Sequence, residues 1–182
     1  MKPFDFSTFP ILKTDRFTLR RLLLTDAAEI YELRSDVKVA TLTGKAPYRS
    51  LDDAIAYINK IDNLVNNNES IYWVIAEEET GPMIGAVCLW DFNTETRTIE
   101  MGYELLPAFQ GKGIMQEAIP RVLKYAFEVM GVQTIVAFPS SDNPPSVKLL
   151  ERLNFNLVQE EHKNTHEGVP GMLAFTFSAP ES

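Results

Sequence analysis

Apolar and polar positions alternate near the start of the chain, over residues 16–22. A period of two is typical of a strand that buries one face, and it directs Phe17 and Leu19 toward the core. A helix start follows, where Asp26 can cap the first turn and Glu29, three residues on, can reach back to a free amide. The beginning of the chain therefore predicts a strand followed by a helix.

The next segment predicts one helix and three strands. Ser50 and Asp53 have capping-box spacing, and apolar residues then recur at helical intervals as far as Val65. After a run of three asparagines, three segments rich in β-branched and aromatic residues are separated by turn residues, at 71–76, 83–90 and 97–106. We expect these three strands to form an antiparallel meander.

A helix–strand alternation completes the chain. Residues 114–129 place apolar side chains on one helix face, and Pro120 inside this stretch predicts a kink because it lacks an amide proton. Gly131 has the position of a helix C-cap, and Asn154 has the same position after a second helix. The remaining elements are a buried strand at 133–138, that short helix at 146–153, and two strands at 155–161 and 171–177.

This order predicts an α/β (α+β) fold with about seven strands and about four helices. The sheet would be mixed and mostly antiparallel, with helices on its faces. Neither an internal repeat nor a linker is visible, so we expect one domain over residues 1–182, with its core at about 10–178.

Composition narrows the class of protein. The 182 residues include 17 Lys and Arg and 25 Asp and Glu, a formal net charge of −8, and 45% are hydrophobic. An acidic surface argues against general nucleic-acid binding, which needs clustered cations, and is compatible with a cationic partner. The first residues lack the apolar core of a signal peptide, and no apolar run reaches membrane-spanning length, which predicts a cytoplasmic protein without a membrane segment.

Few residues are available to bind a metal. Cys88 is the single cysteine and His162 and His166 are the two histidines, so we expect neither a disulfide nor a metal site. Cys88 is expected to be a small buried hydrophobe, and the two histidines are expected to be exposed.

The chemistry-bearing feature is a glycine turn between a strand and a helix, Gln110-Gly111-Lys112-Gly113-Ile114-Met115. Backbone amides left uncovered there, together with the helix dipole, can bind an anion such as a pyrophosphate. The turn lacks the GxxxxGK[S/T] string of a P-loop and the third glycine of a dinucleotide fingerprint. By itself it is equally consistent with a simple helix entry.

Gly111 to Ala118 resembles the GKG-x-M-x-EA variant, found in the RimJ/RimL-like branch, of the Q/R-x-x-G-x-G/A signature of GNAT N-acetyltransferases. Met115 stands where the wider family has Gly or Ala. Four further segments resemble that branch in the same order: Thr14-Asp15-Arg16-Phe17-Thr18-Leu19-Arg20, Ile84-Gly85, Glu100-Met101-Gly102-Tyr103, and Asn143-x-x-Ser146 with Leu153-Asn154-Phe155. The resemblance covers about residues 10 to 178.

The resemblance implies acetyl-CoA as co-substrate and no metal. Two neighbouring parallel strands, the one ending near Leu106 and the one at 133–138, would part at their ends and admit the pantetheine arm. Backbone groups of Leu105 and Leu106 would pair with that arm, and Asn143 would contact its amides. The pyrophosphate would lie on the amides of the glycine turn, which comprises Gln110, Gly111, Lys112, Gly113, Ile114 and Met115.

The resemblance also implies roles in catalysis. Glu100 is the candidate base for the acceptor amine, directly or through water, and Ser146 is the candidate acid or hydrogen-bond donor to the CoA sulfur. Glu104 lies on the same strand face by period two and is the alternative base, or a contact for a cationic acceptor. The structural alternatives are a strand carboxylate for Glu100, a helix-start serine for Ser146 and a capping asparagine for Asn143.

The acceptor is the least defined partner. The RimJ/RimL-like branch implies a protein or peptide N-terminal α-amine, and a basic target such as a ribosomal protein agrees with the net charge. A small amine (polyamine, aminoglycoside or amino-acid derivative) and a non-catalytic acyl-CoA-binding module are the alternatives. Trp73 and Trp90 are expected in the core, where either can line the acceptor cavity. The sequence is consistent with a monomer or a homodimer.

Overall fold

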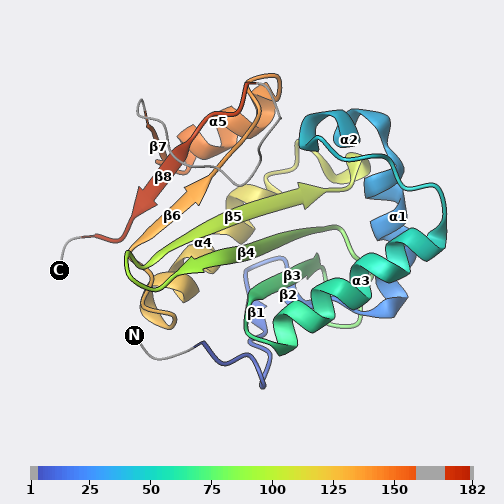
Figure 1. The fold of residues 1–182 in the computed structure, drawn as a ribbon, viewed down its shortest axis with the longest axis horizontal. Coiled ribbons are helices and arrows are strands. Elements are labelled where there is room, and N and C mark those ends of the chain that lie inside the picture. Colours follow the sequence, from blue (N-terminus) through green and yellow to red (C-terminus); the bar gives the residue numbers. More distant parts are fainter. Residues whose placement is uncertain (1–3, 159–170, 181–182) are drawn as a thin grey trace.

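The computed structural model describes residues 4–158 and 171–180. Eight strands form one sheet in the order β1-β2-β3-β4-β5-β6-β8-β7 (Figure 1). The strands are β1 (Leu12–Lys13), β2 (Thr18–Arg21), β3 (Ser70–Ala76), β4 (Gly85–Asn93), β5 (Thr98–Leu105), β6 (Thr134–Ala137), β7 (Asn156–Leu157) and β8 (Phe175–Ser178). The α-helices are α1 (Ala27–Ser35), α2 (Val37–Thr43), α3 (Leu51–Asn66), α4 (Ile114–Glu128) and α5 (Pro144–Arg152).

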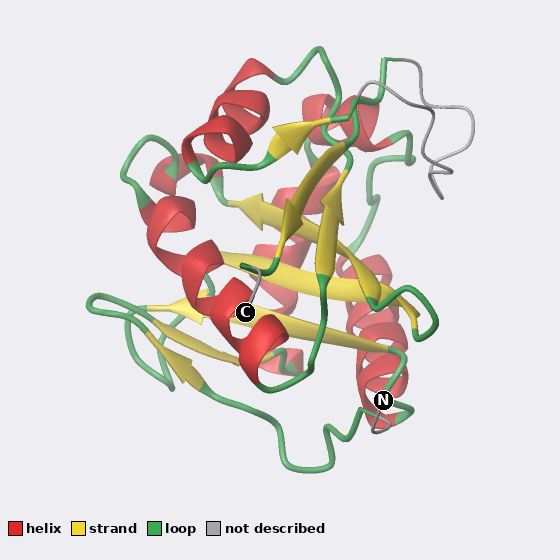
Figure 2. Ribbon diagram, turned by 90° about the vertical axis from the view of Figure 1, so that its left-hand side faces the viewer, coloured by secondary structure: helices red, strands yellow, loops and turns green. Residues whose placement is uncertain are grey.

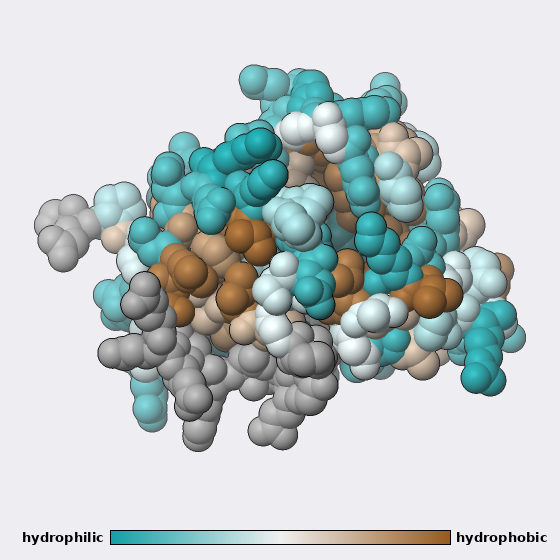
Figure 3. Space-filling view, turned by 90° about the horizontal axis from the view of Figure 1, so that it is seen from above, coloured by the Kyte–Doolittle hydropathy of each residue, from teal (hydrophilic) through white to brown (hydrophobic). Residues whose placement is uncertain are grey.

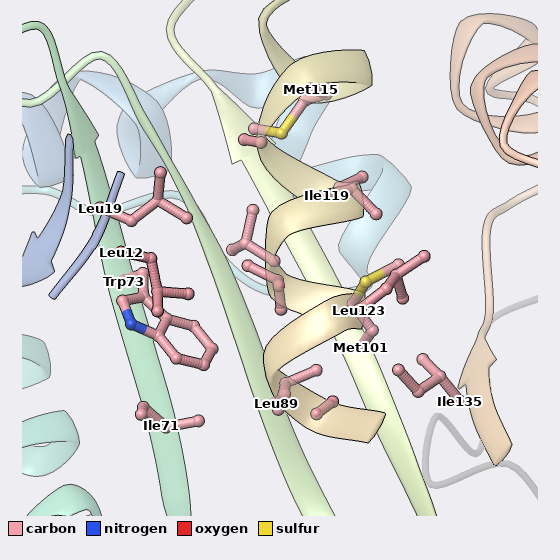
Figure 4. Packing of buried hydrophobic residues seen from close by; sticks show 14 of the residues in the cluster. Leu12, Leu19, Ile71, Trp73, Leu89, Met101, Met115, Ile119, Leu123 and Ile135 are labelled. Atoms are coloured by element: carbon pink, nitrogen blue, oxygen red, sulfur yellow. The ribbon is translucent and has the colours of Figure 1, made fainter. Parts of the chain in front are cut away.

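The helices cover both faces of the sheet (Figures 1 and 2). On one face, α4 packs on the sheet through a large apolar cluster that includes Leu19, Trp73, Leu89 and Ile119 (Figure 4). On the other face, α1 and α3 pack over a smaller cluster that includes Ile30, Ile58, Tyr72 and Ala86. Seen from above, where α5 and α2 lie nearest the viewer, polar side chains cover most of the surface, and apolar ones appear between them (Figure 3).

The predicted meander is confirmed. β3 pairs antiparallel with β4, and β4 pairs antiparallel with β5. Tyr72, Cys88 and Gly102 are register partners across the three strands, so the side chains of this row and of alternate rows share one face. That face lies under α1 and α3 and carries Glu100 and Glu104.

The predicted parallel pair is β5 with β6, and these strands part. Their register covers Thr98 with Thr134, Ile99 with Ile135, and Glu100 with Val136. β5 continues to Leu105 without β6 as a neighbour, and the two ribbons diverge in Figure 1. The gap therefore begins at Glu100.

Strand β2, which the sequence predicted over residues 16–22, is buried on both faces and not on one. Phe17 and Leu19 are buried as expected, but Thr18 and Arg20 on the opposite face are buried as well. The Arg20 guanidinium donates two hydrogen bonds to the Asp26 carboxylate, at 2.7 and 2.9 Å, and a third to the Gly81 carbonyl at 2.8 Å. A buried guanidinium needs a charged partner, which the alternation of residue types cannot reveal.

Helix α1 begins after Asp26, as predicted, but the Asp26 side chain does not cap it. Asp26 ends a short 3-10 turn, and its carboxylate binds Arg20 and the Leu23 amide at 2.9 Å instead of capping α1. Glu29 does not bond to the Asp26 amide, which donates to the Leu23 carbonyl at 2.9 Å, and among the described residues the Glu29 Oε2 has no hydrogen-bond partner. The ion pair with Arg20 therefore replaces the expected cap.

Other element ends follow the local sequence. Asp53 accepts a hydrogen bond from the Ser50 amide at 3.2 Å, as the capping box predicts. Helix α4 continues through Pro120, and Gly131 and Asn154 adopt the left-handed conformation, with φ of 68° and 63°. The prediction missed α2, although Asp36 caps it and Gly44 ends it, because seven residues hold too few apolar positions to show a period.

The last part of the chain is described only in part. β7 spans Asn156–Leu157, so Phe155 and Val158 lie outside the strand that was predicted at 155–161, and residues 159–161 lie outside the described part. β8 begins at Phe175, four residues later than predicted, and Met172 forms an isolated bridge with Ser140. His162 and His166 also lie outside the described residues.

The buried pair of Arg20 and Asp26 supports a stability prediction. Asp26→Asn removes the charge partner of a buried guanidinium, so the free energy of unfolding should fall by about 3 kcal/mol. Urea unfolding at neutral pH measures this change. Glu32→Gln, at an exposed position of α1, is the control and should change it by less than about 0.5 kcal/mol. A loss below about 1 kcal/mol in Asp26→Asn would show that water compensates Arg20.

Candidate active site

A cavity of about 590 Å³ lies between the sheet and the helices α1, α2 and α3, and it reaches the gap between β5 and β6. Its sheet wall carries Glu100, Gly102 and Glu104 from β5. Across the gap it is lined by Asn143 and Ser146. The structure thus brings Glu100 and Glu104 of one strand together with Asn143 and Ser146 of a later segment in one cavity.

Glu100 occupies the point where the two parallel strands separate. It is buried, with 5% of its surface exposed, and it is the last β5 residue in register with β6. Trp90 is its register partner on β4, and Ser70 is the partner of Trp90 on β3. Ser70 is also buried, and its hydroxyl has no hydrogen-bond partner among the described residues.

The Trp90 indole forms part of the cavity wall because Gly102 has no side chain. A Cβ at residue 102 would come within 2.7 Å of the Trp90 ring. The indole therefore lies across β5, on the face that also carries Glu100 and Glu104. The sequence named both Trp73 and Trp90 as candidates for the cavity wall, and Trp90 lines it. Trp73 lies fully buried, and its indole N–H donates to the Pro10 carbonyl at 2.8 Å.

Glu104 is held by protein partners inside the cavity. Its carboxylate accepts hydrogen bonds from the Tyr72 hydroxyl at 2.6 Å and from the Arg34 guanidinium at 3.2 Å. Arg34 also donates to the Tyr57 hydroxyl at 2.7 Å and lies 3.9 Å from the centre of the Tyr57 ring. Burial by itself lowers the pKa of Arg34, but the negative charge of Glu104 raises it above its ordinary value.

A hydroxyl pair spans the gap between β5 and α5. The Tyr103 hydroxyl lies 2.5 Å from the Ser146 Oγ. Burial raises the pKa of Tyr103 to about 12, so its hydroxyl keeps its proton at neutral pH. The prediction did not single out Tyr103, although it belongs to the Glu100-Met101-Gly102-Tyr103 segment.

Asn143 acts as the helix cap of α5. Its side-chain oxygen accepts a hydrogen bond from the Ser146 amide at 3.4 Å, and Pro144 and Pro145 fill the first helical positions. This is the structural alternative considered for Asn143. The cap uses the side-chain oxygen and leaves the side-chain N–H₂ group for other partners.

The backbone of β5 borders the gap beyond Glu100. The Leu106 amide donates to the Ile84 carbonyl at 3.0 Å, and the Leu106 carbonyl accepts from Phe109 at 2.9 Å. Successive strand residues direct their backbone groups to opposite edges, so those of Leu105 face the gap. Leu105 is therefore better placed than Leu106 to pair with an extended ligand.

The glycine turn has the backbone conformation that the sequence indicates. Gly111 and Gly113 have φ of 75° and 71°, which residues with a Cβ rarely adopt. Gly113 is the N-cap residue of α4, and Ile114 and Met115 in the first turn are buried. Gln110 and Lys112 are exposed, and the Lys112 Nζ lies 5.3 Å from the centre of the Phe109 ring.

Three residues hold this turn in place through hydrogen bonds. We call Thr14, Arg16 and Glu117 together the bracket. The Glu117 carboxylate accepts hydrogen bonds from the Thr14 hydroxyl at 2.7 Å, the Arg16 amide at 2.8 Å and the Arg16 side chain at 2.6 Å. The Arg16 guanidinium also donates to the Lys112 carbonyl at 3.3 Å. Residues of two separate resembling segments therefore meet at the turn, which the sequence could not show.

Neither a cysteine nucleophile nor a metal site is found among the described residues. Burial raises the pKa of Cys88 to about 12, with the charge of Glu104 adding to the shift, and its thiol donates to the Gly102 carbonyl at 3.6 Å. Within residues 4–158 and 171–180, no group of three or more His, Cys, Asp or Glu side chains could hold a metal ion. None of the helices in this part is long and apolar enough to cross a membrane.

Comparison with known proteins identifies the family. The family model described as an acetyltransferase (GNAT) domain matches residues 16–156. The chain belongs to the GNAT acetyltransferase family, in its RimJ/RimL-like branch. It is therefore an acetyl-CoA-dependent N-acetyltransferase.

Relatives agree with this assignment. YoaA, an N-acetyltransferase of Bacillus subtilis strain 168 whose name gives no substrate, is 32% identical over 147 residues, which cover 81% of this chain and 83% of YoaA. Spermidine N-acetyltransferase from Vibrio cholerae, solved with CoA and spermine, has a TM-score of 0.72 and 26% identity over 90% of this chain and 95% of its own.

The same fold occurs in ribosomal-protein-S5-alanine acetyltransferase from Vibrio fischeri. That structure has a TM-score of 0.72 and 21% identity, and the match covers 93% of this chain and 96% of the other. Identity at this level supports the fold, and the acceptors named for these relatives belong to those proteins.

The bracket supports a prediction on the pH dependence of stability. Burial by itself raises the pKa of Glu117, but hydrogen bonds from Thr14 and Arg16 lower it below 4.5. Stabilisation by a carboxylate with a lowered pKa is complete above its ordinary pKa and is lost as the pH falls through the lowered one. Wild type should therefore exceed Glu117→Gln in unfolding free energy by up to about 1 kcal/mol at pH 7.

Urea unfolding of the two proteins between pH 7 and about pH 3 measures this difference, which should shrink over the acidic part of the range. Glu128→Gln, at an exposed position of the same helix, is the control. A difference that stays constant with pH would contradict an ionised bracket.

Proposed function

We propose that this N-acetyltransferase moves the acetyl group of acetyl-CoA to a protein or peptide N-terminal α-amine by direct attack. Glu100 is the base, and Ser146 assists the departing thiolate. The carrying observation is the position of Glu100 at the point where β5 and β6 part, with Ser146 facing the same cavity from α5. A thioester in the gap would have a carboxylate on one side and a hydroxyl on the other.

The co-substrate site extends from this gap to the glycine turn. Leu105 directs its backbone groups toward the gap, where the pantetheine arm would pair with them, and Asn143 offers its side-chain amide. The pyrophosphate would lie on the N–H groups at the start of α4, between Gly111 and Met115, where the helix dipole favours an anion. An acidic protein can bind a polyanion here because the favourable potential comes from local backbone dipoles.

Glu100 would start the reaction by taking a proton from the acceptor ammonium, directly or through one water. The neutral amine then forms a bond from nitrogen to the acetyl carbon, and the carbon–sulfur bond breaks as the tetrahedral intermediate collapses. Glu104 is the weaker candidate base because Arg34 and Tyr72 already bind its carboxylate and stabilise its charged form.

Ser146 would donate its proton to the thiolate, and the extra proton that the attacking nitrogen loses as the amide forms restores the Ser146 hydroxyl, directly or through water. With the Tyr103 hydroxyl as donor to Ser146, the Ser146 proton is free to point at the sulfur, and each hydrogen bond strengthens the next. Tyr103 then acts as a positioning residue for Ser146. Cys88 supports direct attack, because its raised pKa keeps it as a thiol and unsuited to form an acyl intermediate.

A small-amine acceptor is the second candidate. The observation in its favour is the 26% identity to a spermidine N-acetyltransferase solved with spermine. Acetylation of small amines without acetylation of peptides would establish it. Binding of CoA without acetylation of any amine would instead favour a non-catalytic acyl-CoA-binding module.

Substitution of Glu100 tests the base. Glu100→Gln should lower kcat about 10²- to 10⁴-fold and leave the KM for acetyl-CoA little changed, because the amide cannot accept the proton. Release of free CoA in the presence of peptides with a free N-terminus measures the rate. Glu95→Gln, at an exposed position of the β4–β5 turn, should retain wild-type activity.

Two further variants test the thiolate side. Ser146→Ala should lower kcat and leave the KM for acetyl-CoA little changed, and Tyr103→Phe should show a smaller loss of kcat.

Activity of Glu100→Gln within about threefold of wild type would exclude Glu100 as the base. An unchanged rate in Ser146→Ala would remove the proposed acid.

The bracket should also affect use of the co-substrate. The Arg16 bond to the Lys112 carbonyl fixes that peptide plane, so the Gly113 N–H points to the opposite side, where we place the pyrophosphate. Arg16→Ala should lower kcat/KM for acetyl-CoA about tenfold and leave kcat/KM for S-acetylpantetheine, which lacks the pyrophosphate, unchanged. Lys13→Gln, an exposed substitution on β1, is the control. An equal loss with both donors would contradict this role.

A further inference from the structure

We propose that Arg34 and Lys45 set the acceptor specificity of this enzyme. They exclude acceptors with a second positive charge and favour an amine that carries an anionic group further along the acceptor, such as a peptide with an acidic second residue. The inference rests on the proposed function, because it concerns the acceptor of that reaction.

Arg34 already occupies the part of the cavity that suits a cation. Aromatic rings and a carboxylate are the groups that bind an organic ammonium, and Tyr57, Tyr72 and Glu104 supply them. The Arg34 guanidinium lies on the Tyr57 ring and donates to both Tyr57 and Glu104, and its side chain is 15% exposed. A second ammonium of the acceptor would find this place filled by a fixed positive charge.

Two lysines add positive charge to the same cavity. Lys45, which follows α2, and Lys60 on α3 both line it. In the part of the chain that the structure describes, the four salt bridges include neither lysine. Burial and then the charge of Arg34 lower the pKa of Lys45, and the charge of Glu104 offsets part of this shift, so Lys45 lies within electrostatic range of the Arg34–Glu104 pair.

Glu69, Asp91 and Glu100 are the other carboxylates that line the cavity. Glu69 and Asp91 are exposed and flank the row formed by Ser70, Trp90 and Glu100. Glu104 lies four residues beyond Glu100 on β5, which separates their Cα atoms by roughly 13 Å at about 3.3 Å per residue. One end of the cavity thus holds the proposed base, and the other holds Arg34 and Lys45.

An acceptor amine at Glu100 would therefore extend toward positive charge. An anionic group on the acceptor gains attraction there, and a second ammonium is repelled, both more strongly than in water because the cavity is partly buried. The buried, unpartnered hydroxyl of Ser70 offers the acceptor a polar contact at the opposite end. The net charge of −8 suggests a basic partner, whereas Arg34 and Lys45 at one end of the cavity favour an acceptor with an acidic group beyond its amine.

Three matched peptides test this inference: Ala-Glu-amide, Ala-Ala-amide and Ala-Lys-amide. Wild type should acetylate them in that order, with kcat/KM at least tenfold higher for the glutamate than for the lysine peptide. Lys45→Glu should reduce this ratio at least tenfold or reverse it. Added salt should shrink the wild-type ratio, because screening weakens charge interactions in a solvent-connected cavity.

Lys38→Gln is the matched control. Lys38 is an exposed lysine on the neighbouring helix α2 and does not line the cavity, so the ratio should stay as in wild type. Lys45→Gln should give an intermediate ratio, which separates loss of charge from loss of fold. Equal or better use of the lysine peptide by wild type, or an unchanged ratio in Lys45→Glu, would overturn the inference.

Four-carbon amines separate this inference from the proposed function. If no peptide is acetylated, the peptide assignment fails, and 4-aminobutanoate, butylamine and 1,4-diaminobutane then carry the same comparison. A preference for 4-aminobutanoate over the diamine would retain the charge rule with a small acceptor. A preference for the diamine, or no acetylation in either series, would overturn it.

Discussion

The short parallel ladder between β5 and β6 is the constraint on which the rest of the site depends. Three residue pairs join the two strands, and beyond Glu100 the backbones of β5 and β6 are no longer paired. Unpaired strand edges are costly when buried, so the backbone groups at this gap need partners of another kind. An extended amide chain such as pantetheine would supply them, and this pairing would link the fold directly to the co-substrate of the family.

The elements around the gap have complementary tasks. The glycine turn and the N-terminus of helix α4 follow the C-terminal end of β5, beyond Glu100. Helix α5 places Ser146 across from Tyr103. Helices α1 to α3 close the opposite face and enclose the cavity where we propose that the acceptor binds. One sheet therefore separates an apolar core under α4 from a polar chamber, through the period-two alternation of its side chains.

Charge acts locally in this molecule. The chain as a whole is acidic, yet the start of α4 offers backbone N–H groups to an anion, and the cavity contains Arg34, Lys45 and Lys60. Interactions beyond about 8–10 Å are largely screened at physiological ionic strength, so these near groups outweigh the net charge. The bracket follows the same rule, because Arg16 neutralises Glu117 next to the turn that would receive a pyrophosphate.

The sequence by itself determined the order of the main elements, the meander, the glycine turn and the left-handed positions at Gly131 and Asn154, since these depend on local periodicity and backbone sterics. The family resemblance added Glu100 and Ser146. Only the tertiary structure decided that Arg20 takes Asp26 from its expected cap, that Tyr103 meets Ser146, that the bracket joins Thr14 and Arg16 to Glu117, and that Arg34 fills the pocket beside Glu104. These pairs join residues on different elements, up to 103 positions apart, and no local pattern specifies which charged or hydroxyl group a buried partner will find.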